Sequence, residues 1–85
     1  MKKFIAEIDI MPIREILDPQ GKAVTLGLNN LGLNEVAEAR VGKHITLQLE
    51  AESEDKAKEK VETACQKLLA NLIMEKYSYE ILAVE

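Results

Sequence analysis

Residues 35–50 alternate between apolar and polar side chains, a pattern typical of a β-strand with one face towards a core. The odd positions carry the mostly apolar set Ala37, Ala39, Val41, Lys43, Ile45, Leu47 and Leu49. The phase continues through Gly42, where a two-residue hairpin would pair apolar with polar positions. We therefore predict one long strand over residues 35–50, bent at Gly42.

The predicted length of this strand exceeds what a compact chain of this size can accommodate. At about 3.3 Å per residue the stretch would span roughly 50 Å. A compact chain of this length has a radius of gyration of only about 12 Å. We expect part of the strand to extend beyond its own domain and to contact another polypeptide.

Two further segments alternate in the same way. Residues 3–11 form a strand that Pro12 ends, because proline has no N–H to donate to a sheet. Its apolar face consists of Phe4, Ala6, Ile8 and Ile10. Residues 77–84 form the last strand, and both faces of its second half are apolar, which indicates cover from two sides.

A helix is predicted between Asp18 and Gly32. Asp18 is a good N-cap, and Pro19 suits the first helical position, where its missing N–H has no helical partner to lose. An apolar stripe follows at helical spacing, formed by Val24, Leu28 and Leu31. Gly32 occupies the left-handed position of a Schellman cap, with Leu28 and Leu33 as its apolar pair.

A second helix is predicted from Glu54 to Ala70, ending near Asn71. Ser53 is its N-cap, and the acidic residues that follow suit the positive end of the helix dipole. Residues 13–17 connect the first strand to the first helix. The order is β-α-β-α-β, so the expected fold is a small α+β domain spanning residues 1–85, with a three-stranded sheet. We expect the long bent strand to be central and both helices to cover one face. The other face then lacks cover, which predicts a homodimer or homotetramer.

Composition excludes several function classes. The chain has 85 residues, of which 47% are hydrophobic and 31% charged, and its net charge of −4 argues against nucleic-acid binding. No apolar run approaches the ~20 residues that span a bilayer, and the N-terminus lacks a signal peptide, so we expect a cytoplasmic protein without membrane contact.

No residue pattern indicates catalysis, a metal site or a cofactor. His44 is the only histidine and lies on the polar phase of the long strand, so we expect it at a surface or interface. Cys65, the only cysteine, falls on the apolar stripe of the second helix and is interpreted as a buried thiol. The residues alone therefore indicate a non-catalytic interaction module.

Three motifs carry a family resemblance: residues 17–24 (Leu-Asp-Pro-Gln-Gly-Lys-Ala-Val), Leu31-Gly32 and residues 40–43 (Arg-Val-Gly-Lys). With these motifs at their spacing, the whole chain resembles the PurS family, the small subunits of phosphoribosylformylglycinamidine synthase in purine biosynthesis. The resemblance implies a carbon–nitrogen ligase complex with glutamine as amido donor. In it a glutaminase subunit releases ammonia, and a synthetase subunit uses ATP to convert formylglycinamide ribonucleotide to its amidine. The small subunit would bridge the two and help ammonia to pass between them.

The residues expected to dock partner subunits are Asp18, Gln20, Gly21, Arg40, Gly42 and Lys43. Asp18 and Gly42 also have local explanations, as a helix cap and a bend. Gln20, Arg40 and Lys43 have no evident internal role, which favours an interface. Because Lys43 interrupts an apolar face, we expect it at the margin of the sheet or paired with a carboxylate.

Two other classes remain open on the sequence. One is a stand-alone ferredoxin-like sensor of small molecules, which dimerises through its sheets. An effector-binding sensor would be expected to carry a glycine-rich loop after the first strand, and residues 12–18 contain no glycine. The other is a small isomerase or cyclase, which would need a base at the mouth of a pocket.

Overall fold

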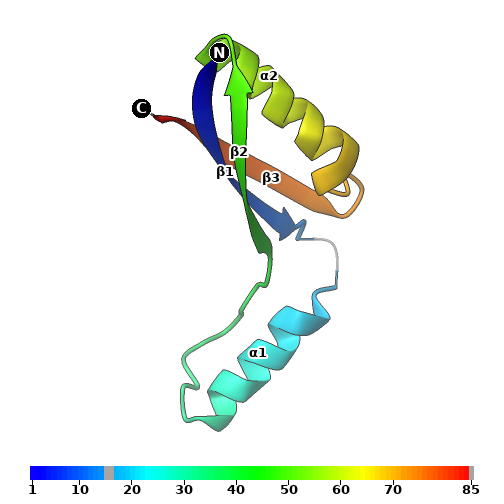
Figure 1. Ribbon diagram of the computed structural model, residues 1–85. Coiled ribbons are helices and arrows are strands. Elements are labelled where there is room, and N and C mark those ends of the chain that lie inside the picture. Colours follow the sequence, from blue (N-terminus) through cyan, green and yellow to red (C-terminus); the bar gives the residue numbers. More distant parts are fainter. Residues whose placement is uncertain (15–16, 85) are drawn as a thin grey trace.

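The computed structural model describes residues 1–14 and 17–84, and in them the predicted element order is confirmed (Figure 1). The elements are β1 (Lys2–Pro12), α1 (Pro19–Asn30), β2 (Lys43–Ala51), α2 (Glu54–Ala64), a π-helical turn η1 (Cys65–Leu69) and β3 (Glu75–Val84). The fold is a small α+β domain with one three-stranded sheet, as predicted. Residues 15 and 16 of the predicted connector lie outside the described residues.

The sheet is antiparallel throughout, with strand order β2-β1-β3. The prediction of a long central strand over residues 35–50 is therefore wrong in two respects: β1 is central, and β2 begins only at Lys43. The register gives the reason. Lys43 lies opposite Ile10, so residues before Lys43 would have to pair with the end of β1 at Pro12, which has no N–H to donate.

One face of the sheet and α2 enclose the core. The main cluster consists of Ala6, Ile8, Ile10, Val61, Cys65 and Ala70, and a smaller one of Phe4, Ala51 and Ala57. Ile45, Leu47 and Leu49 of β2 pack against these clusters, whereas Thr46 and Gln48 are exposed. The predicted phase of the strand is thus confirmed within β2.

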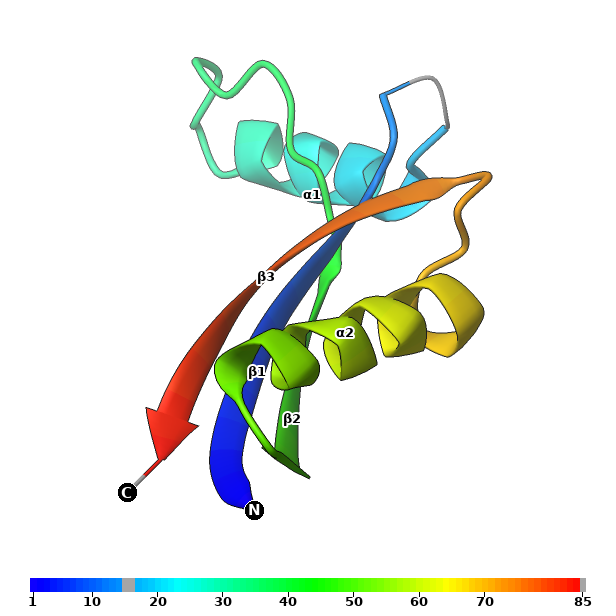
Figure 2. The same cartoon turned by 90° about the horizontal axis from the view of Figure 1, so that it is seen from above.

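Helix α1 does not cover the sheet, which corrects the prediction of two helices on one face. It projects from the end of the sheet, and residues 33–42 run back beside it as an extended segment (Figures 1 and 2). Its predicted core stripe is consequently open, with Val24 44% and Leu31 78% exposed. We call residues 13–42 the arm and the remainder the body.

The arm explains why the chain is extended. The radius of gyration is 16.6 Å and the longest dimension 52 Å, against about 12 Å for the radius of gyration of a compact chain of this length. The predicted overhang is confirmed, although a helix and an extended segment form it in place of a strand.

Both ends of α1 are formed as the sequence predicts. The carboxylate of Asp18 caps the first turn by accepting from the Gly21 N–H at 2.9 Å. At the other end Gly32 has a φ of 92°, and the N–H groups of Gly32 and Leu33 each donate at 3.0 Å, to Asn29 O and Leu28 O respectively. These two bonds define the Schellman cap.

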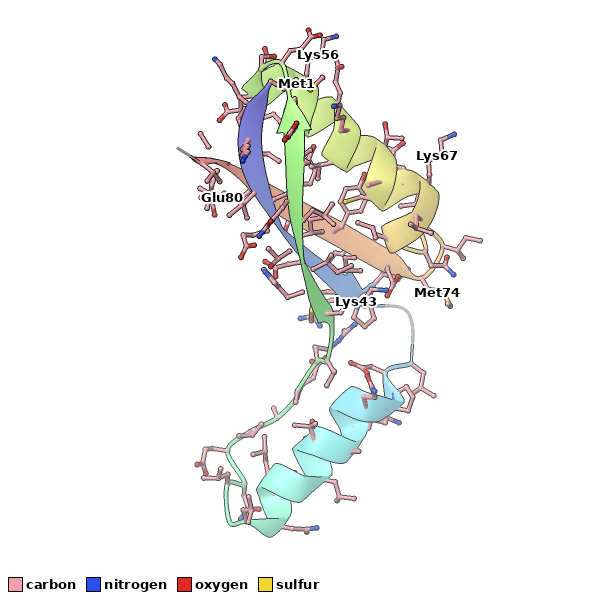
Figure 3. All side chains as sticks on the ribbon, viewed as in Figure 1. Met1, Lys43, Lys56, Lys67, Met74 and Glu80 are labelled. Atoms are coloured by element: carbon pink, nitrogen blue, oxygen red, sulfur yellow. The ribbon has the colours of Figure 1, made fainter. Side chains whose placement is uncertain are left out.

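The sheet face opposite α2 is not covered by any described element. Glu80 points away from α2 on this side (Figure 3). Leu82 and Val84 of β3 are 47% and 40% exposed. No helix among residues 1–14 and 17–84 is long and apolar enough to cross a membrane.

Candidate functional site

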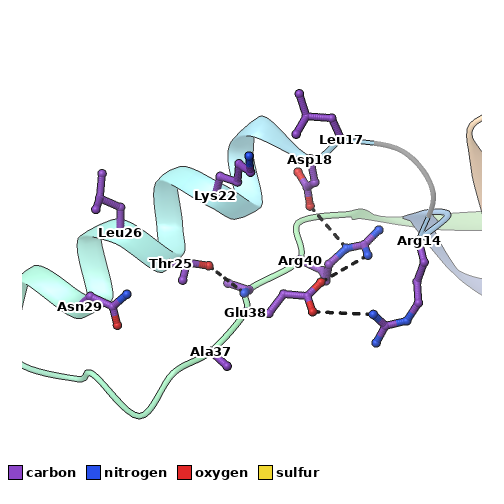
Figure 4. Close-up of a pocket in the computed structure, with 11 residues that line it drawn as sticks. Arg14, Leu17, Asp18, Lys22, Thr25, Leu26, Asn29, Ala37, Glu38 and Arg40 are labelled. Carbon is purple, nitrogen blue, oxygen red and sulfur yellow. Dashed lines mark hydrogen bonds and ion pairs between the residues drawn. The ribbon is translucent and has the colours of Figure 1, made fainter.

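The junction between arm and body brings together four of the six predicted docking residues: Asp18, Gly21, Arg40 and Gly42 (Figure 4 shows Asp18 and Arg40). Asp18 begins α1, and Arg40 lies on the extended segment that leads into β2. The junction forms because the fold brings the start of α1, with its cap Asp18, next to the segment before β2, which carries Arg40.

Asp18 joins two segments through its two carboxylate oxygens. Oδ1 accepts from the Gly21 N–H and Oδ2 from the Val41 N–H, each at 2.9 Å. The Val41 bond is the main cause that lowers the pKa of Asp18, the Gly21 bond is the next, and the charge of Arg40 adds to both against an opposing desolvation. Asp18 is therefore the predicted cap and also a tie between α1 and the segment before β2.

Arg40 binds the end of β1. Its Nη2 donates to the carbonyl oxygens of Pro12 at 2.8 Å and Ile13 at 3.0 Å. Its Nε lies 3.8 Å from Asp18 Oδ2, and its side chain is only 20% exposed. The expectation that Arg40 has no internal role is wrong. Sequence reasoning missed this role because its acceptors are main-chain carbonyls, which no side-chain pattern marks.

Glu38 and Arg14 extend this network towards solvent. Glu38 lies 3.5 Å from Arg40 Nη1 and 3.7 Å from Arg14 Nη1, and its side chain is about half exposed. Exposed ion pairs of this kind contribute little to stability.

Close packing at the junction requires two of the predicted glycines. A Cβ at Gly21 would overlap the carbonyl oxygen of Ala39 and the Asp18 carboxylate. A Cβ at Gly42 would overlap the Ile10 carbonyl oxygen and the Met11 sulfur. Both glycines thus allow the extended segment to pass close to α1 and to β1.

Thr25 is a structural residue of the arm that sequence reasoning missed. Its Oγ1 donates to the Gly21 carbonyl oxygen and accepts from the Ala39 N–H, both at 2.8 Å. A threonine nearly two turns after the helix start gives no sequence signal for a contact fourteen residues away.

Gln20 and Lys43 lie apart from this junction. Gln20 is exposed on the first turn of α1. Lys43 begins β2, and its Nζ lies 3.9 Å from Glu75 Oε2, which confirms the expected carboxylate pairing.

A groove of about 860 Å³ lies between α1 and residues 37–40 of the arm (Figure 4). Leu17 and Leu26 line it and are 66% and 63% exposed. Lys22 and Arg14 add positive charge to the same groove. Among the described residues that line the groove, none is a nucleophile hydrogen-bonded to a base.

His44 and Cys65 occupy the environments that the sequence predicts. The His44 ring lies on the exposed sheet face, 2.7 Å from Asp9 Oδ1 and 3.2 Å from Glu7 Oε2. The pKa of His44 is raised, mainly by its hydrogen bond to Asp9 and next by its hydrogen bond to Glu7. Cys65 is fully buried, and that burial raises the pKa of its thiol, which makes the nucleophilic thiolate scarce.

Glu62 on α2 accepts hydrogen bonds from Tyr77 and Tyr79 of β3, the second at 2.7 Å. The bond to Glu62 raises the pKa of Tyr79 to about 12. The pKa of the Glu62 carboxyl is lowered, first by the hydrogen bond from Tyr77 and next by the one from Tyr79. These bonds fasten α2 across the sheet and offer no base to a substrate.

Comparison with known proteins gives one consistent family. The model of the PurS family, described as phosphoribosylformylglycinamidine (FGAM) synthase, matches residues 5–83. The phosphoribosylformylglycinamidine synthase subunit PurS of Synechocystis is 47% identical over 70 residues, which are 82% of this chain and 70% of that protein.

Solved structures agree with this similarity. PurS of Thermus thermophilus is 38% identical with a TM-score of 0.87 and covers 98% of this chain and 99% of its own. A chain in the structure of PurLQS from Thermotoga maritima is 35% identical with a TM-score of 0.88, over 96% of this chain and all of the other. The extended arm is included in these matches because almost the whole chain is covered.

Proposed function

The chain belongs to the PurS family, and we propose that it is a non-catalytic bridging subunit of a phosphoribosylformylglycinamidine synthase. The observation that carries this proposal is its near-complete structural likeness to a chain of the PurLQS structure, at a TM-score of 0.88. Its own residues agree, because the described part of the chain leaves apolar side chains open for contact with partners. In this proposal residues 1–85 form a single PurS-like domain.

The proposed partners are the glutaminase and synthetase subunits of one complex. The glutaminase releases ammonia from glutamine, and the synthetase uses ATP and this ammonia to convert formylglycinamide ribonucleotide to formylglycinamidine ribonucleotide. Ammonia is protonated in water near neutral pH, which removes its nucleophilic lone pair. A bridge that holds both active sites together and excludes water keeps ammonia neutral and close.

The surface of the chain supports self-association within this complex. Apolar side chains are open both on the arm, at Leu26 and Leu31, and on the bare sheet face, at Leu82 and Val84. Monomeric proteins rarely leave such surfaces uncovered. The chain is therefore a homodimer or homotetramer in the proposed complex, which works in the cytoplasm without membrane or nucleic-acid contact.

Gln20 and Lys43 are the proposed docking residues that keep polar groups open to a partner, since both are exposed. Asp18, Gly21, Arg40 and Gly42 contribute to docking by shaping the junction between arm and body. Charge reversal at Lys43 should weaken assembly because a glutamate there would repel an acidic partner surface, as well as Glu75 of the same chain.

The proposal is tested by mixing the purified chain with the synthetase and glutaminase subunits of its host and separating the mixture by size. Co-elution of all three chains supports the bridge. Elution of the small chain by itself under every substrate condition contradicts it and favours a stand-alone protein.

A further inference from the structure

We infer that Asp18 and Arg40 form a latch that fixes the angle of the arm relative to the body, and that this angle is needed for coupling between subunits. The latch consists of these two side chains and the main-chain groups that they bind. The second half of this inference rests on the proposed function. The first half concerns the chain alone.

The arm needs such a device because packing does not hold it. Helix α1 projects clear of the sheet and of α2, and its apolar stripe is open (Figures 1 and 2). Two chain crossings join arm to body, one after β1 and one before β2. Without further ties, a connection of this kind allows hinge motion.

The latch ties both crossings and the start of α1 together. Arg40, before β2, donates to the Pro12 and Ile13 carbonyl oxygens at the end of β1. Asp18, at the start of α1, accepts from the Val41 N–H at 2.9 Å and lies 3.8 Å from Arg40 Nε. The Asp18 and Arg40 side chains are only 12% and 20% exposed, so water competes weakly for their hydrogen bonds.

The chemistry of the two side chains suits this task. A guanidinium is always charged and presents its nitrogens in a rigid plane, so Arg40 holds both carbonyl oxygens with Nη2 while its Nε faces Asp18. A lysine at position 40 would have only one nitrogen, on a flexible stem, with which to contact both the carbonyl oxygens and Asp18. A carboxylate offers two acceptor oxygens, and Asp18 uses one for the helix cap and the other for Val41.

Asn at position 18 separates capping from latching. Asparagine is as good an N-cap as aspartate. Its amide, however, replaces one of the two carboxylate oxygens with an NH2 donor, and Asp18 binds the Gly21 and Val41 N–H groups at separate oxygens, so Asp18→Asn would present a donor to one of them. Arg40→Lys retains the positive charge but replaces the planar guanidinium, which has three nitrogens, with a single ammonium nitrogen. Arg14→Lys is the matched control, because Arg14 is 77% exposed and its ion pair, to Glu38 at 3.7 Å, lies outside the latch.

The angle of the arm can be read from the distance between two spin labels, at Asn30→Cys on the arm and Lys58→Cys on α2. Both positions are exposed, and Cys65 is buried and stays unlabelled. Labelled chain is diluted into unlabelled chain so that distances between subunits do not contribute. The same variants are then assayed in the reconstituted complex for the ratio of glutamine-driven to ammonium-driven product formation.

We expect one narrow distance distribution for the unaltered chain and for Arg14→Lys, and a broad one for Asp18→Asn and Arg40→Lys. The two latch variants should also lose roughly tenfold in the rate ratio, since misplacement by about 1 Å can cost as much as ~10²-fold. Narrow distributions in both latch variants would overturn the latch. Broad distributions with an unchanged rate ratio would overturn its role in coupling. If the unaltered chain does not raise the rate ratio, the proposed function is contradicted. The latch is then tested by the spin-label distances alone.

Discussion

Alanine substitutions at two glycines of α1 should have opposite effects on stability. Gly21 and Gly27 lie in the same helix, and each lowers its intrinsic stability by about 1 kcal/mol relative to alanine. A Cβ at Gly27 would meet nothing within 4 Å. Gly27→Ala should therefore stabilise by about 1 kcal/mol, which corresponds to a rise in Tm of about 4–8 °C for a domain of this size.

Gly21→Ala gains the same helix propensity but loses more than it gains. The new methyl group would overlap the Ala39 carbonyl oxygen, so the extended segment must move away from α1. That movement breaks the bond from Ala39 N–H to Thr25 Oγ1, worth about 1 kcal/mol net, which offsets the propensity gain. Overpacking adds a penalty of about 1–3 kcal/mol, so the variant should be less stable by about that amount.

The assay is thermal unfolding followed by circular dichroism, together with amide hydrogen exchange of residues 22–30, because the arm can open before the body does. Exchange in α1 should slow in Gly27→Ala and accelerate in Gly21→Ala. If Gly21→Ala stabilises α1 as much as Gly27→Ala, then the close passage of residues 37–40 along the helix is wrong.

Three further outcomes follow from the surfaces described above. In β2, Leu47→Asp should unfold the body because Leu47 packs on the core, whereas Gln48→Asp on the exposed face should leave the free energy of unfolding within about 0.5 kcal/mol. Similar free energies of unfolding for the two variants would contradict the facing of β2. The raised pKa of His44 means that its bonds to Asp9 and Glu7 stabilise the fold fully below its ordinary pKa of about 6.5 and are lost as pH rises through the folded value. As pH rises from about 6.5 through the raised pKa of His44, the urea midpoint should therefore fall in the unaltered chain and not in His44→Gln. The same dependence of the midpoint on pH in both proteins would exclude a stabilising role for these His44 bonds. The isolated chain should elute and scatter light as a dimer or larger, and a species near 9.5 kDa at micromolar concentration would refute self-association.

Elements whose signals are local were predictable from sequence. The cap at Asp18, the proline after it and the Schellman turn at Gly32 all depend on residues within one or two turns of each other. The phase of β2 was also predictable, since alternation reports which face is buried whatever the strand order.

The arm was predicted only in part because its geometry depends on contacts far apart in sequence. Residues 36–41 alternate like a strand, yet β1 offers them no partner beyond Pro12. The side chains of Thr25 and Asp18 instead bind the N–H groups of Ala39 and Val41. Arg40 illustrates the same limit: its acceptors lie on the backbone 27 and 28 residues earlier. A cation and a carboxylate that lie far apart in the sequence, such as Arg40 and Asp18, are compatible with either an interface or a latch. Only the distance between them in the structure shows that they contact each other.

In the proposed function this chain couples ammonia release to ammonia use without chemistry of its own. The measurement that tests it most directly is the ratio of glutamine-driven to ammonium-driven amidine formation by the synthetase and glutaminase subunits, with and without the chain. The chain alone should neither hydrolyse glutamine nor turn over ATP. Adding it should raise the glutamine-driven rate strongly and the ammonium-driven rate little, because external ammonium salt supplies the synthetase without a bridge. An unchanged ratio would contradict the bridging function.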